Sequence, residues 1–533
     1  MSQSTHFLDH QALFKHPRYF AQIESPSTLP SEEEYAGKPW HDVVYDVASR
    51  LVGTGYQLEK PKEWENPIGD ELQVFDALTQ ILPKLSDQSI FYWHRSARAL
   101  AALLESAKYP VKAQTSHLVF WWARLGGLNG VTKLGRTKPA RTMWVRDGSN
   151  TEVSWVIPHK TSPDETGNRH VRFAIDPFHP ESGLRLAGGA VIDWLWGWGS
   201  MGLVENDEGT KDWKEIIEKW LFPEIPNSEW VVGDCHYAIA FDLEPSGLIQ
   251  LKSYYVPPRK PLTPDGPIPK AGTIIANPKT LHPIETLLPL LHPSLKEPFD
   301  LLTDYFTDEG VEKSGLRFLA IACDVTKEAN NRLKLYMWPT IAHSLNDTIR
   351  DLTLGGRIQG PGIDDAIANV RKLYKRLFPG NGDDDKMVPR DGGIGGLSFY
   401  YELIVGEKYP ASKAYFDMSN YGINDYETTK SVEAFFADVG KPGVSGKEGW
   451  YTNSVQRTCP HRPLSSRSGA QTGVTFGMKP KGWQITGYIT TEVYAPERGI
   501  GTVDGKHVVK KTGEEPDYTW DELVKEFYKI FVG

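Results

Sequence analysis

The sequence contains few cysteines and no long apolar run, and each shortage excludes a class of protein. Three cysteines occur, Cys235, Cys323 and Cys459, with no paired spacing. This argues against a disulfide framework or a zinc site and favours a reducing compartment. No run of about 18 apolar residues is present to span a bilayer, and the N-terminus lacks the basic and apolar regions of a signal peptide. We therefore predict a cytoplasmic protein with no membrane partner.

A basic surface is missing as well. The net charge is −9, which disfavours a nucleic-acid partner, since such partners need a basic face. Hydrophobic residues make up 40% and charged residues 24% of the chain, as in an ordinary globular protein. The composition leaves small-molecule substrates as the expected partners. It leaves open whether the protein is a monomer or a homodimer.

Motifs for metal and nucleotide chemistry are also lacking. The acidic cluster Asp383–Asp385 lies in a glycine-containing turn, which is typical of a solvated loop rather than of a helical magnesium–diphosphate site. Gly440–Lys447 has the wrong glycine spacing for a P-loop. Neither a GxSxG elbow nor an HExxH motif occurs, so no sequence motif supports a hydrolase.

What the sequence does contain is a repeated pattern of lysine, spacer and tyrosine. The lysines recur at intervals of about 80 residues. The copies are Lys252-Ser-Tyr254, Lys334-Leu-Tyr336 and Lys413-Ala-Tyr415, and similar steps reach Arg172 before them and Tyr488 after them. A single copy is typical of a solvent-facing strand, but the matched spacing favours five repeated units. Because one unit is too small to bury a core, the repeats predict one closed domain.

The third unit shows what each repeat forms. Two apolar runs flank a polar turn and predict a β-hairpin, whose second strand begins at Arg332. Side chains alternate along a strand, so Arg332, Lys334 and Tyr336 point to one side and Leu333 and Leu335 to the other. The basic and phenolic residues therefore share one face of the sheet.

Amphipathic helices separate the hairpins, for example over Ile363–Leu377. Their apolar faces must cover the apolar face of the sheet, which leaves the basic face on the other side. We predict an α/β fold in which five α-β-β-α units form a closed ten-stranded antiparallel β-barrel, with helices outside and a polar lumen. Residues 1–36 are expected to be a flexible leader. A single domain follows over 37–533, with a helical part at 37–150, barrel repeats at 151–500 and a C-terminal helix within 501–533.

With these features, the sequence resembles the fungal aromatic (indole) prenyltransferases of the dimethylallyltryptophan synthase type, which have the ABBA fold. The resemblance covers roughly residues 150–500. It is most specific in Arg332-Leu-Lys-Leu-Tyr336, Thr353-Leu-Gly-Gly-Arg357, Ser412-Lys-Ala-Tyr415 and Gly487-Tyr-Ile489. The resemblance implies transfer of a prenyl group from an allylic diphosphate, dimethylallyl diphosphate, to an aromatic acceptor by electrophilic aromatic substitution. The implied acceptor is an indole or tryptophan-derived secondary metabolite.

The resemblance also assigns roles to individual residues. Glu152 is implied to accept a hydrogen bond from the indole N–H. The implied diphosphate ligands are Arg172, Lys252, Arg332, Lys334 and Lys413, and the implied shields of the allyl cation are Tyr254, Tyr336, Tyr415 and Tyr488. The residue types fit these roles, because arginine and lysine stabilise a leaving diphosphate and tyrosine rings stabilise a cation. No metal cofactor is expected, since the basic residues supply the counter-charge.

Three positions depart from the family pattern. Ala238 stands where some members have a lysine, Gly473 where a tyrosine is common, and Asp417 where a proline is common. Ala238 and Gly473 are therefore predicted to set the size of the pocket. These departures leave open a phenolic or polyketide acceptor, and a non-catalytic barrel that binds a small ligand is a further alternative. The sequence does not name the acceptor or the length of the prenyl donor.

Overall fold

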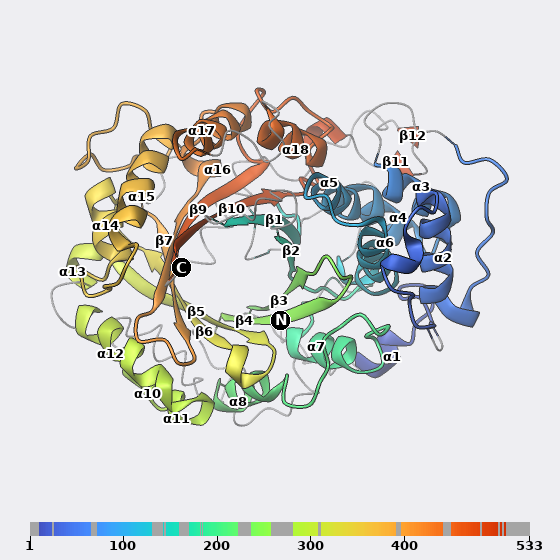
Figure 1. The fold of residues 1–533 in the computed structure, drawn as a ribbon, viewed down its shortest axis with the longest axis horizontal. Helices are drawn as coiled ribbons and strands as arrows, with labels where there is room; N and C mark the ends of the chain where they lie inside the picture. Colours follow the sequence, from blue (N-terminus) through green and yellow to red (C-terminus); the bar gives the residue numbers. More distant parts are fainter. Residues whose placement is uncertain are drawn as a thin grey trace, which may run out of the picture.

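Ten antiparallel strands close into a barrel in the computed structural model, in the order β1-β10-β9-β8-β7-β6-β5-β4-β3-β2, and helices surround it (Figure 1). The strands are β1 (Thr151–Pro158), β2 (His170–Ile175), β3 (His236–Leu243), β4 (Ile249–Val256), β5 (Leu316–Val325), β6 (Arg332–Pro339), β7 (Ser398–Ile404), β8 (Ala411–Phe416), β9 (Gln471–Lys479) and β10 (Gly482–Thr490). This confirms the predicted closed barrel. Because each strand is paired on both sides, the sheet has no free edge.

The structure describes residues 10–23, 26–65, 72–130, 142, 145, 147–158, 170–181, 183, 185–221, 236–256, 281–306, 311–390, 396–440, 449–479, 482–498, 502–503 and 506–507. The helices within these residues are α1 (His10–Phe14), α2 (Trp40–Val52), α3 (Gln73–Ile81), α4 (Asp87–Tyr92), α5 (Arg98–Ser106), α6 (Val111–Phe120), α7 (Gly188–Trp196), α8 (Asp212–Leu221), α10 (His282–Glu285), α11 (Leu288–Leu291), α12 (Lys296–Tyr305), α13 (Val311–Ser314), α14 (Leu345–Leu352), α15 (Ile363–Leu377), α16 (Met418–Tyr421), α17 (Asp425–Asp438) and α18 (Trp450–Thr458). None of them is both long and apolar enough to cross a membrane.

The hydrophobic core lies between the outer face of the barrel and the surrounding helices. On β6, Leu333 and Leu335 are fully buried on that face, and α15 packs against β9 and β10 with Val370 and Leu373 buried. Burying one such side chain contributes roughly 1.5–3 kcal/mol. Since apolar residues at every second strand position face the helices, their polar neighbours face the lumen.

Local sequence signals fix where these helices begin. The Ser344 hydroxyl accepts a hydrogen bond from the Asp347 amide at the start of α14, and the Asp347 carboxylate accepts one from the Ser344 amide at 2.8 Å. This capping box satisfies two amides that a helix start leaves unpaired. The Asn424 side chain caps α17 in the same way by accepting a hydrogen bond from Glu427 N. Of these two helices, α14 packs against β8, and α17 packs against the neighbouring helices α15 and α18.

The prediction of a flexible leader over residues 1–36 is wrong for residues 10–23. Phe14 and Phe20 are buried, and the Phe14 ring stacks on Trp194 of α7 with centroids 4.2 Å apart. Ala21 N also donates a hydrogen bond to Ala123 O. This segment therefore packs against the helices around the barrel, because burial of its aromatic side chains offsets the cost of ordering its backbone.

The predicted C-terminal helix is only partly testable. Residues 502–503 and 506–507 form two short paired strands, β11 (Thr502–Val503) and β12 (Lys506–His507), so the helix does not begin at residue 501. The helical stretch expected at Trp520–Phe531 lies outside the described residues.

Candidate active site

The barrel encloses a cavity of about 230 Å³. Most of the residues singled out in the sequence line it, namely Glu152, Arg172, Lys252, Tyr254, Arg332, Lys334, Tyr336, Lys413, Tyr415, Gly473 and Tyr488. They come from seven different strands and from sequence positions up to 336 residues apart, as Glu152 and Tyr488 show. Closure of the sheet is therefore what brings them together.

Alternation along the strands sorts these side chains into layers. On β6, Arg332, Lys334, Tyr336 and Trp338 occupy every second position and all line the cavity. On β8 the order is Lys413, Tyr415 and then Asp417 just after the strand. Residues two apart on one strand are separated by about 6–7 Å. Cations thus form one layer of the lumen, phenol rings the next, and Trp338 and Asp417 lie beyond the rings.

Two buried aspartates connect the cations of the first layer. Asp324 Oδ1 lies 2.8 Å from Lys334 Nζ, and its Oδ2 lies 2.6 Å from Arg332 Nε. Asp242 lies 3.0 Å from Arg172 Nε and also pairs with Lys252. Coulombic attraction from these cations holds the pKa of Asp324 well below its usual range despite burial. The aspartates therefore stay ionised and keep the cations oriented.

A third carboxylate and a sixth cation extend this layer. Glu402 of β7 is fully buried, lies 2.6 Å from Arg332 Nη1 and also pairs with Lys479 at the end of β9. Neither Glu402 nor Lys479 was singled out from the sequence. The alternation of β7, with Tyr400 and Glu402 on one face, was the available signal. From sequence alone, a glutamate on a strand cannot be distinguished from an ordinary polar residue, because its pairing partner on β6 is not known.

The first layer keeps an excess of positive charge. Among the residues that the structure describes, six cationic side chains and three carboxylates meet in it, so cations exceed acids by three. Burial lowers the pKa of Lys252 to about 7, with repulsion from Arg172 adding to it, and burial lowers the pKa of Lys479 to about 8. The carboxylates thus leave part of the positive charge of this layer without a counter-charge, which suits the layer to a polyanion.

Lys413 differs from the other cations in its surroundings. Its ammonium donates a hydrogen bond to Thr486 Oγ1 at 3.1 Å and lies 5.3 Å from the centroid of the Tyr400 ring. It is 6.0 Å from the ring of Tyr415 and 5.9 Å from that of Tyr488. Burial lowers the pKa of this lysine well below its usual value. Lys413 therefore stands at the boundary between the cation layer and the tyrosine layer.

The tyrosine layer is continuous. Ring centroids are separated by 6.0 Å for Tyr254 and Tyr336, 6.5 Å for Tyr336 and Tyr415, and 5.7 Å for Tyr415 and Tyr488. Tyr400, which sequence analysis missed, lies 5.3 Å from Tyr336 and 6.0 Å from Tyr415. Burial raises the pKa of Tyr488 to about 12, so this phenol stays neutral. The layer offers π-faces to a cation while excluding water.

Glu152 lies at the other end of the cavity. It is 8% exposed and accepts a hydrogen bond from the Thr472 hydroxyl at 2.7 Å. Burial raises the pKa of Glu152 to about 8, and the nearby charges of Asp417 and Asp147 add to the shift. A buried carboxyl of this kind is suited to accept a hydrogen bond from a ring N–H that becomes more acidic during reaction.

The two positions predicted to set pocket size differ. An added Cβ at Gly473 would meet only Phe416 O, at 3.6 Å, so the glycine leaves open space beside Tyr488, its partner in β10. Ala238 is fully buried opposite Tyr254 in the β3–β4 pair, but Ala240, two residues on, lines the cavity instead. Gly473 is therefore the position of the two that borders the cavity.

The acidic cluster at Asp383–Asp385 lies outside the lumen and is already paired. Asp383 forms ion pairs with Arg371 and, at 2.7 Å, with Lys375. Asp384 accepts a hydrogen bond from Asn346 at 2.8 Å. The Asp383 side chain is 41% exposed. This geometry fits the solvated loop expected from the sequence.

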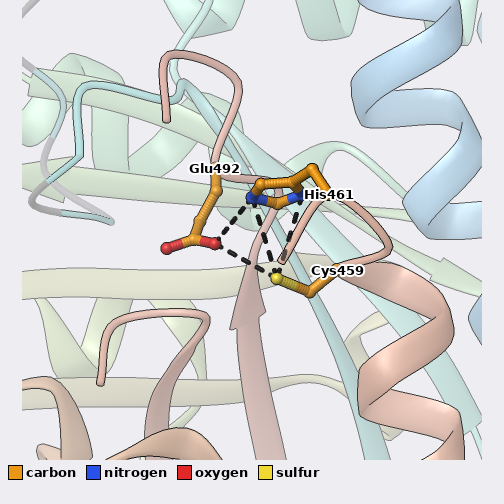
Figure 2. Close-up of side chains that lie close together, drawn as sticks. All are labelled: Cys459, His461 and Glu492. Atoms are coloured by element: carbon orange, nitrogen blue, oxygen red, sulfur yellow. Dashed lines mark hydrogen bonds and ion pairs between the residues drawn. The ribbon is translucent and has the colours of Figure 1, made fainter. Parts of the chain in front are cut away.

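Cys459, His461 and Glu492 offer three ligand-type atoms within 4.8 Å of one another (Figure 2). Both Glu492 oxygens are occupied by arginines, however: Arg462 Nε lies 2.8 Å from Oε2, and Arg467 Nη1 lies 2.6 Å from Oε1. A divalent ion here would face two guanidinium groups, and that repulsion is strong in a buried site. The cluster fits an ion-pair network that fixes the chain after β10 against the end of α18.

Comparison with known proteins shows which family the chain matches. The family model for tryptophan dimethylallyltransferase matches residues 88–448. The 7-dimethylallyltryptophan synthase hasE of Aspergillus fumigatus is 24% identical in an alignment of 494 residues that covers 85% of this chain and 98% of that protein. The 4-O-dimethylallyl-L-tyrosine synthase of Claviceps purpurea is 23% identical and covers 75% of this chain and 87% of its own. The crystal structure of AnaPT from Neosartorya fischeri matches with a TM-score of 0.59 at 18% identity, over 78% of this chain and 97% of that one.

The family match and the structural match agree with a cavity that holds a layer of cations and a layer of tyrosines. The family match spans well over half of the chain, and the solved structure confirms the fold. The resemblance inferred from the lysine and tyrosine repeats is confirmed. The chain thus belongs to the tryptophan dimethylallyltransferase family and is an aromatic prenyltransferase with the ABBA barrel fold.

Proposed function

We propose that this prenyltransferase transfers a dimethylallyl group from dimethylallyl diphosphate to the ring of an indole. One observation carries the proposal: a single cavity holds, in order, an excess of cations, a layer of tyrosines and the buried carboxyl of Glu152. A diphosphate among the cations places the allylic carbon beside the tyrosine rings. An indole whose N–H faces Glu152 then presents its ring to that carbon.

Ionisation of the donor is the first step. The bond between the allylic carbon and the diphosphate oxygen breaks, and both electrons leave with the diphosphate. The developing trianion meets Arg172, Lys252, Arg332, Lys334 and Lys413, which are already oriented by Asp242 and Asp324. Preorganised cations of this kind lower the barrier because they need no reorganisation as charge develops.

Capture of the cation is the second step. The faces of Tyr254, Tyr336, Tyr415 and Tyr488 stabilise the allyl cation, by about 1–2 kcal/mol for each desolvated contact. The indole ring donates a π electron pair to the cation and forms the new C–C bond. Glu152, by accepting a hydrogen bond from the indole N–H, raises the electron density of the ring. Loss of a proton from the alkylated carbon restores aromaticity, and the proposed acceptor of that proton is the diphosphate released in the first step.

We propose that this chemistry needs no metal. The excess positive charge of the cation layer matches a trianionic diphosphate, so the protein itself supplies the counter-charge. The acidic cluster at Asp383–Asp385, which would be the alternative ligand set, is engaged with basic and amide side chains outside the lumen.

A phenolic acceptor is the second candidate. The relative from Claviceps purpurea is named for a product of tyrosine, so the family extends to phenol acceptors. A phenol O–H can donate to Glu152 as an indole N–H does. The indole is favoured because the matched family and the relative with the broader coverage are both named for tryptophan.

A substrate screen tests the proposal. The purified enzyme is incubated with five-, ten- and fifteen-carbon allylic diphosphates and a panel of acceptors: tryptophan, a tryptophan-containing cyclic dipeptide, a larger indole alkaloid, tyrosine and a phenolic polyketide. We expect mass-spectrometric products with the five-carbon donor and at least one indole. Products from phenols alone would replace the indole with the phenolic alternative, and diphosphate release with no alkylated product from any acceptor would contradict the proposal.

A further inference from the structure

Asp425 occupies the first position of α17 and holds the chain segment that leads to Thr472. Its side chain is 1% exposed and accepts hydrogen bonds from three successive amides, Gly469 N at 3.2 Å, Ala470 N at 3.0 Å and Gln471 N at 2.9 Å. Successive amides of a regular strand point to opposite sides, so their convergence on one carboxylate marks a bend in the backbone. Hydrogen bonds to a carboxylate are stronger than those between neutral groups. Asp425 thus fixes the chain at the point where β9 begins.

The other side of this segment is fixed by β10. Ala470 O accepts a hydrogen bond from Thr490 N at 2.9 Å, and Thr490 is the residue that pairs with Glu152 between β1 and β10. Ala470 therefore binds α17 through its amide and β10 through its carbonyl. Thr472 follows two residues later and donates its hydroxyl hydrogen bond to Glu152 Oε1 at 2.7 Å. The position of that hydroxyl is thus set by Asp425 and Ala470, which do not line the cavity themselves.

A buried ion-pair network keeps the Asp425 carboxylate in place. The Arg462 side chain is 1% exposed, and it lies 2.5 Å from Asp425 Oδ2 and 2.8 Å from Glu492 Oε2. Glu492, drawn in Figure 2, lies two residues beyond the end of β10. Burial raises the pKa of Asp425 above its usual value, and Arg462 opposes that shift. Arg462 therefore favours the ionised carboxylate, which can accept all three amides.

We propose that Asp425 is a positioning residue for the acceptor end of the active site: by holding residues 469–471 it directs the Thr472 hydroxyl at Glu152 and so keeps that carboxyl in one orientation toward the acceptor. The inference rests on the proposed function, because it assumes that Glu152 accepts the hydrogen bond of the acceptor N–H. A glutamate side chain has several accessible rotamers, and a fixed donor restricts it to one of them. Asp425 acts on the reaction through Thr472 and does not touch the substrate.

Loss of this hydrogen bond has a signature that a loss of stability alone does not have. The Thr472 hydroxyl favours the ionised form of Glu152, whereas burial and the charges of Asp417 and Asp147 raise the pKa of Glu152. Tyr488, another titratable neighbour of Glu152, stays neutral because its pKa is about 12. Without the hydroxyl the pKa of Glu152 rises further, so the rise of kcat with pH moves to higher pH. An N-methylindole does not use the carboxyl and should be much less affected.

Steady-state kinetics with two matched acceptors test the inference. The acceptors are tryptophan, or the indole on which the substrate screen gives product, and its N-methyl analogue. We expect Thr472→Val and Asp425→Asn each to lower kcat with the N–H acceptor by roughly 10-fold and with the N-methyl acceptor by less than about twofold. The rise of kcat with pH should move upward by about 0.5 unit or more. Thr472→Ser, which keeps the hydroxyl, should retain the wild-type ratio of the two rates.

The double variant and a matched control separate positioning from stability. Asp425→Asn in the Thr472→Val background should change the ratio of the two rates no further, because Asp425 acts through that hydroxyl. The control is Asn424→Ala, since Asn424 caps α17 by accepting a hydrogen bond from Glu427 N at 2.8 Å and is the neighbour of Asp425 in sequence. We expect this control to lower the melting temperature and to leave the ratio unchanged. If Asp425→Asn melts too low to measure, Asp425→Glu and Arg462→Lys carry the same comparison.

Glu152→Gln is the reference that separates the inference from the proposed function. If Glu152→Gln slows both acceptors equally, the carboxyl does not serve the ring N–H, and the proposed arrangement of the acceptor fails together with the inference. If Glu152→Gln is selective for the N–H acceptor but Asp425→Asn only lowers the melting temperature, the inference alone is overturned and Asp425 is a structural tether. Selectivity in Thr472→Val without selectivity in Asp425→Asn would likewise overturn the role of Asp425.

Discussion

Thr472 donates its hydroxyl hydrogen bond to the Glu152 carboxylate at 2.7 Å, and it is also the extra residue of a β-bulge. Tyr488 pairs with Gly473 while Ile489 pairs with Gln471, so Thr472 has no opposite partner in β10. In a regular strand two consecutive residues face opposite sides. The bulge lets both Thr472 and Gly473 line the cavity. One irregularity thus positions the carboxyl and opens the pocket beside it.

Replacement of Glu152 by glutamine should slow the reaction with N–H acceptors. If the ionised carboxyl strengthens its hydrogen bond as the ring becomes cationic, Glu152→Gln should reduce turnover by about 100-fold or more while donor binding is retained. The loss should be much smaller with an N-methylindole, which cannot form this bond. Steady-state rates with the matched pair of acceptors measure the difference, and equal losses would assign Glu152 a structural role.

The pH dependence of turnover should follow the same carboxyl. Burial raises the pKa of Glu152 to about 8, so the group is mostly neutral below that pH and mostly ionised above it. With saturating donor and acceptor, we expect kcat to rise with pH between 6 and 8 in the wild type. Glu152→Gln should lack this limb. A rising limb that persists in the variant would show that another group controls it.

Loss of a single cation should weaken donor ionisation. Lys334→Ala removes a preorganised contact, and we expect a loss of about 2–4 kcal/mol in transition-state stabilisation, measured as kcat/KM for the donor. Asp324 keeps Arg332 as its ion-pair partner, so the fold should survive. Lys252→Ala and Arg332→Ala should behave similarly, whereas Lys386→Ala, outside the barrel, should have no effect. Small and equal effects at all four sites would place the diphosphate elsewhere.

Donor binding should take up protons at alkaline pH. Burial and Arg172 lower the pKa of Lys252 to about 7, so this lysine is mostly neutral at pH 8. A bound trianion favours the charged form and raises that pKa. We expect diphosphate affinity to fall as the pH rises above 7. Calorimetry in two buffers of different ionisation enthalpy should show net proton uptake at pH 8 and much less at pH 6. No uptake at pH 8 would mean that the lysine is already charged.

Removal of divalent ions should leave the reaction running. Because arginine and lysine balance the diphosphate, product should still form in excess EDTA, at an equal or modestly reduced rate. Complete loss that only magnesium restores would refute the metal-free mechanism. The Asp383–Asp385 loop would then be the candidate metal-binding site.

A tyrosine at position 473 should narrow the acceptor range. The open space beside Gly473 accepts a Cβ, and a tyrosine side chain would bury up to about 200 Å² of lumen. We expect Gly473→Tyr to depress the use of bulky substrates and to spare a five-carbon donor with a small indole. Thermal melting provides the control, since an unchanged melting temperature with a narrowed range supports a pocket role. A lower melting temperature with uniform loss would show that the bulge itself requires glycine.

The sequence predicted the fold and most of the candidate site because both depend on short-range periodicity. Alternation along β6 placed Arg332, Lys334 and Tyr336 on one face without knowledge of the fold. The carboxylates that hold these cations were missed, since Asp324 and Glu402 acquire meaning only when β5 and β7 are paired with β6. Lys479 was missed because it lies on β9, the first strand of its hairpin, whereas the repeated lysines lie on the second strands β4, β6 and β8.

The prediction for the N-terminal segment was wrong for a different reason. The prediction of flexibility relied on the serine and proline content of residues 1–36. In the structure, the individual side chains of Phe14 and Phe20 are buried, and the Phe14 ring stacks on Trp194. Tertiary packing of two side chains outweighs the average tendency of a short segment. Composition alone therefore does not indicate whether such a segment is packed.

The fixed step between each cation and its tyrosine has an evolutionary consequence. The two side chains stand on one strand, two residues apart, so the polypeptide backbone itself sets the gap between the leaving group and the shield. Drift in the surrounding helices cannot change that gap. Substitutions can thus accumulate in the helices and loops around the barrel without altering the distance between the cation layer and the tyrosine layer.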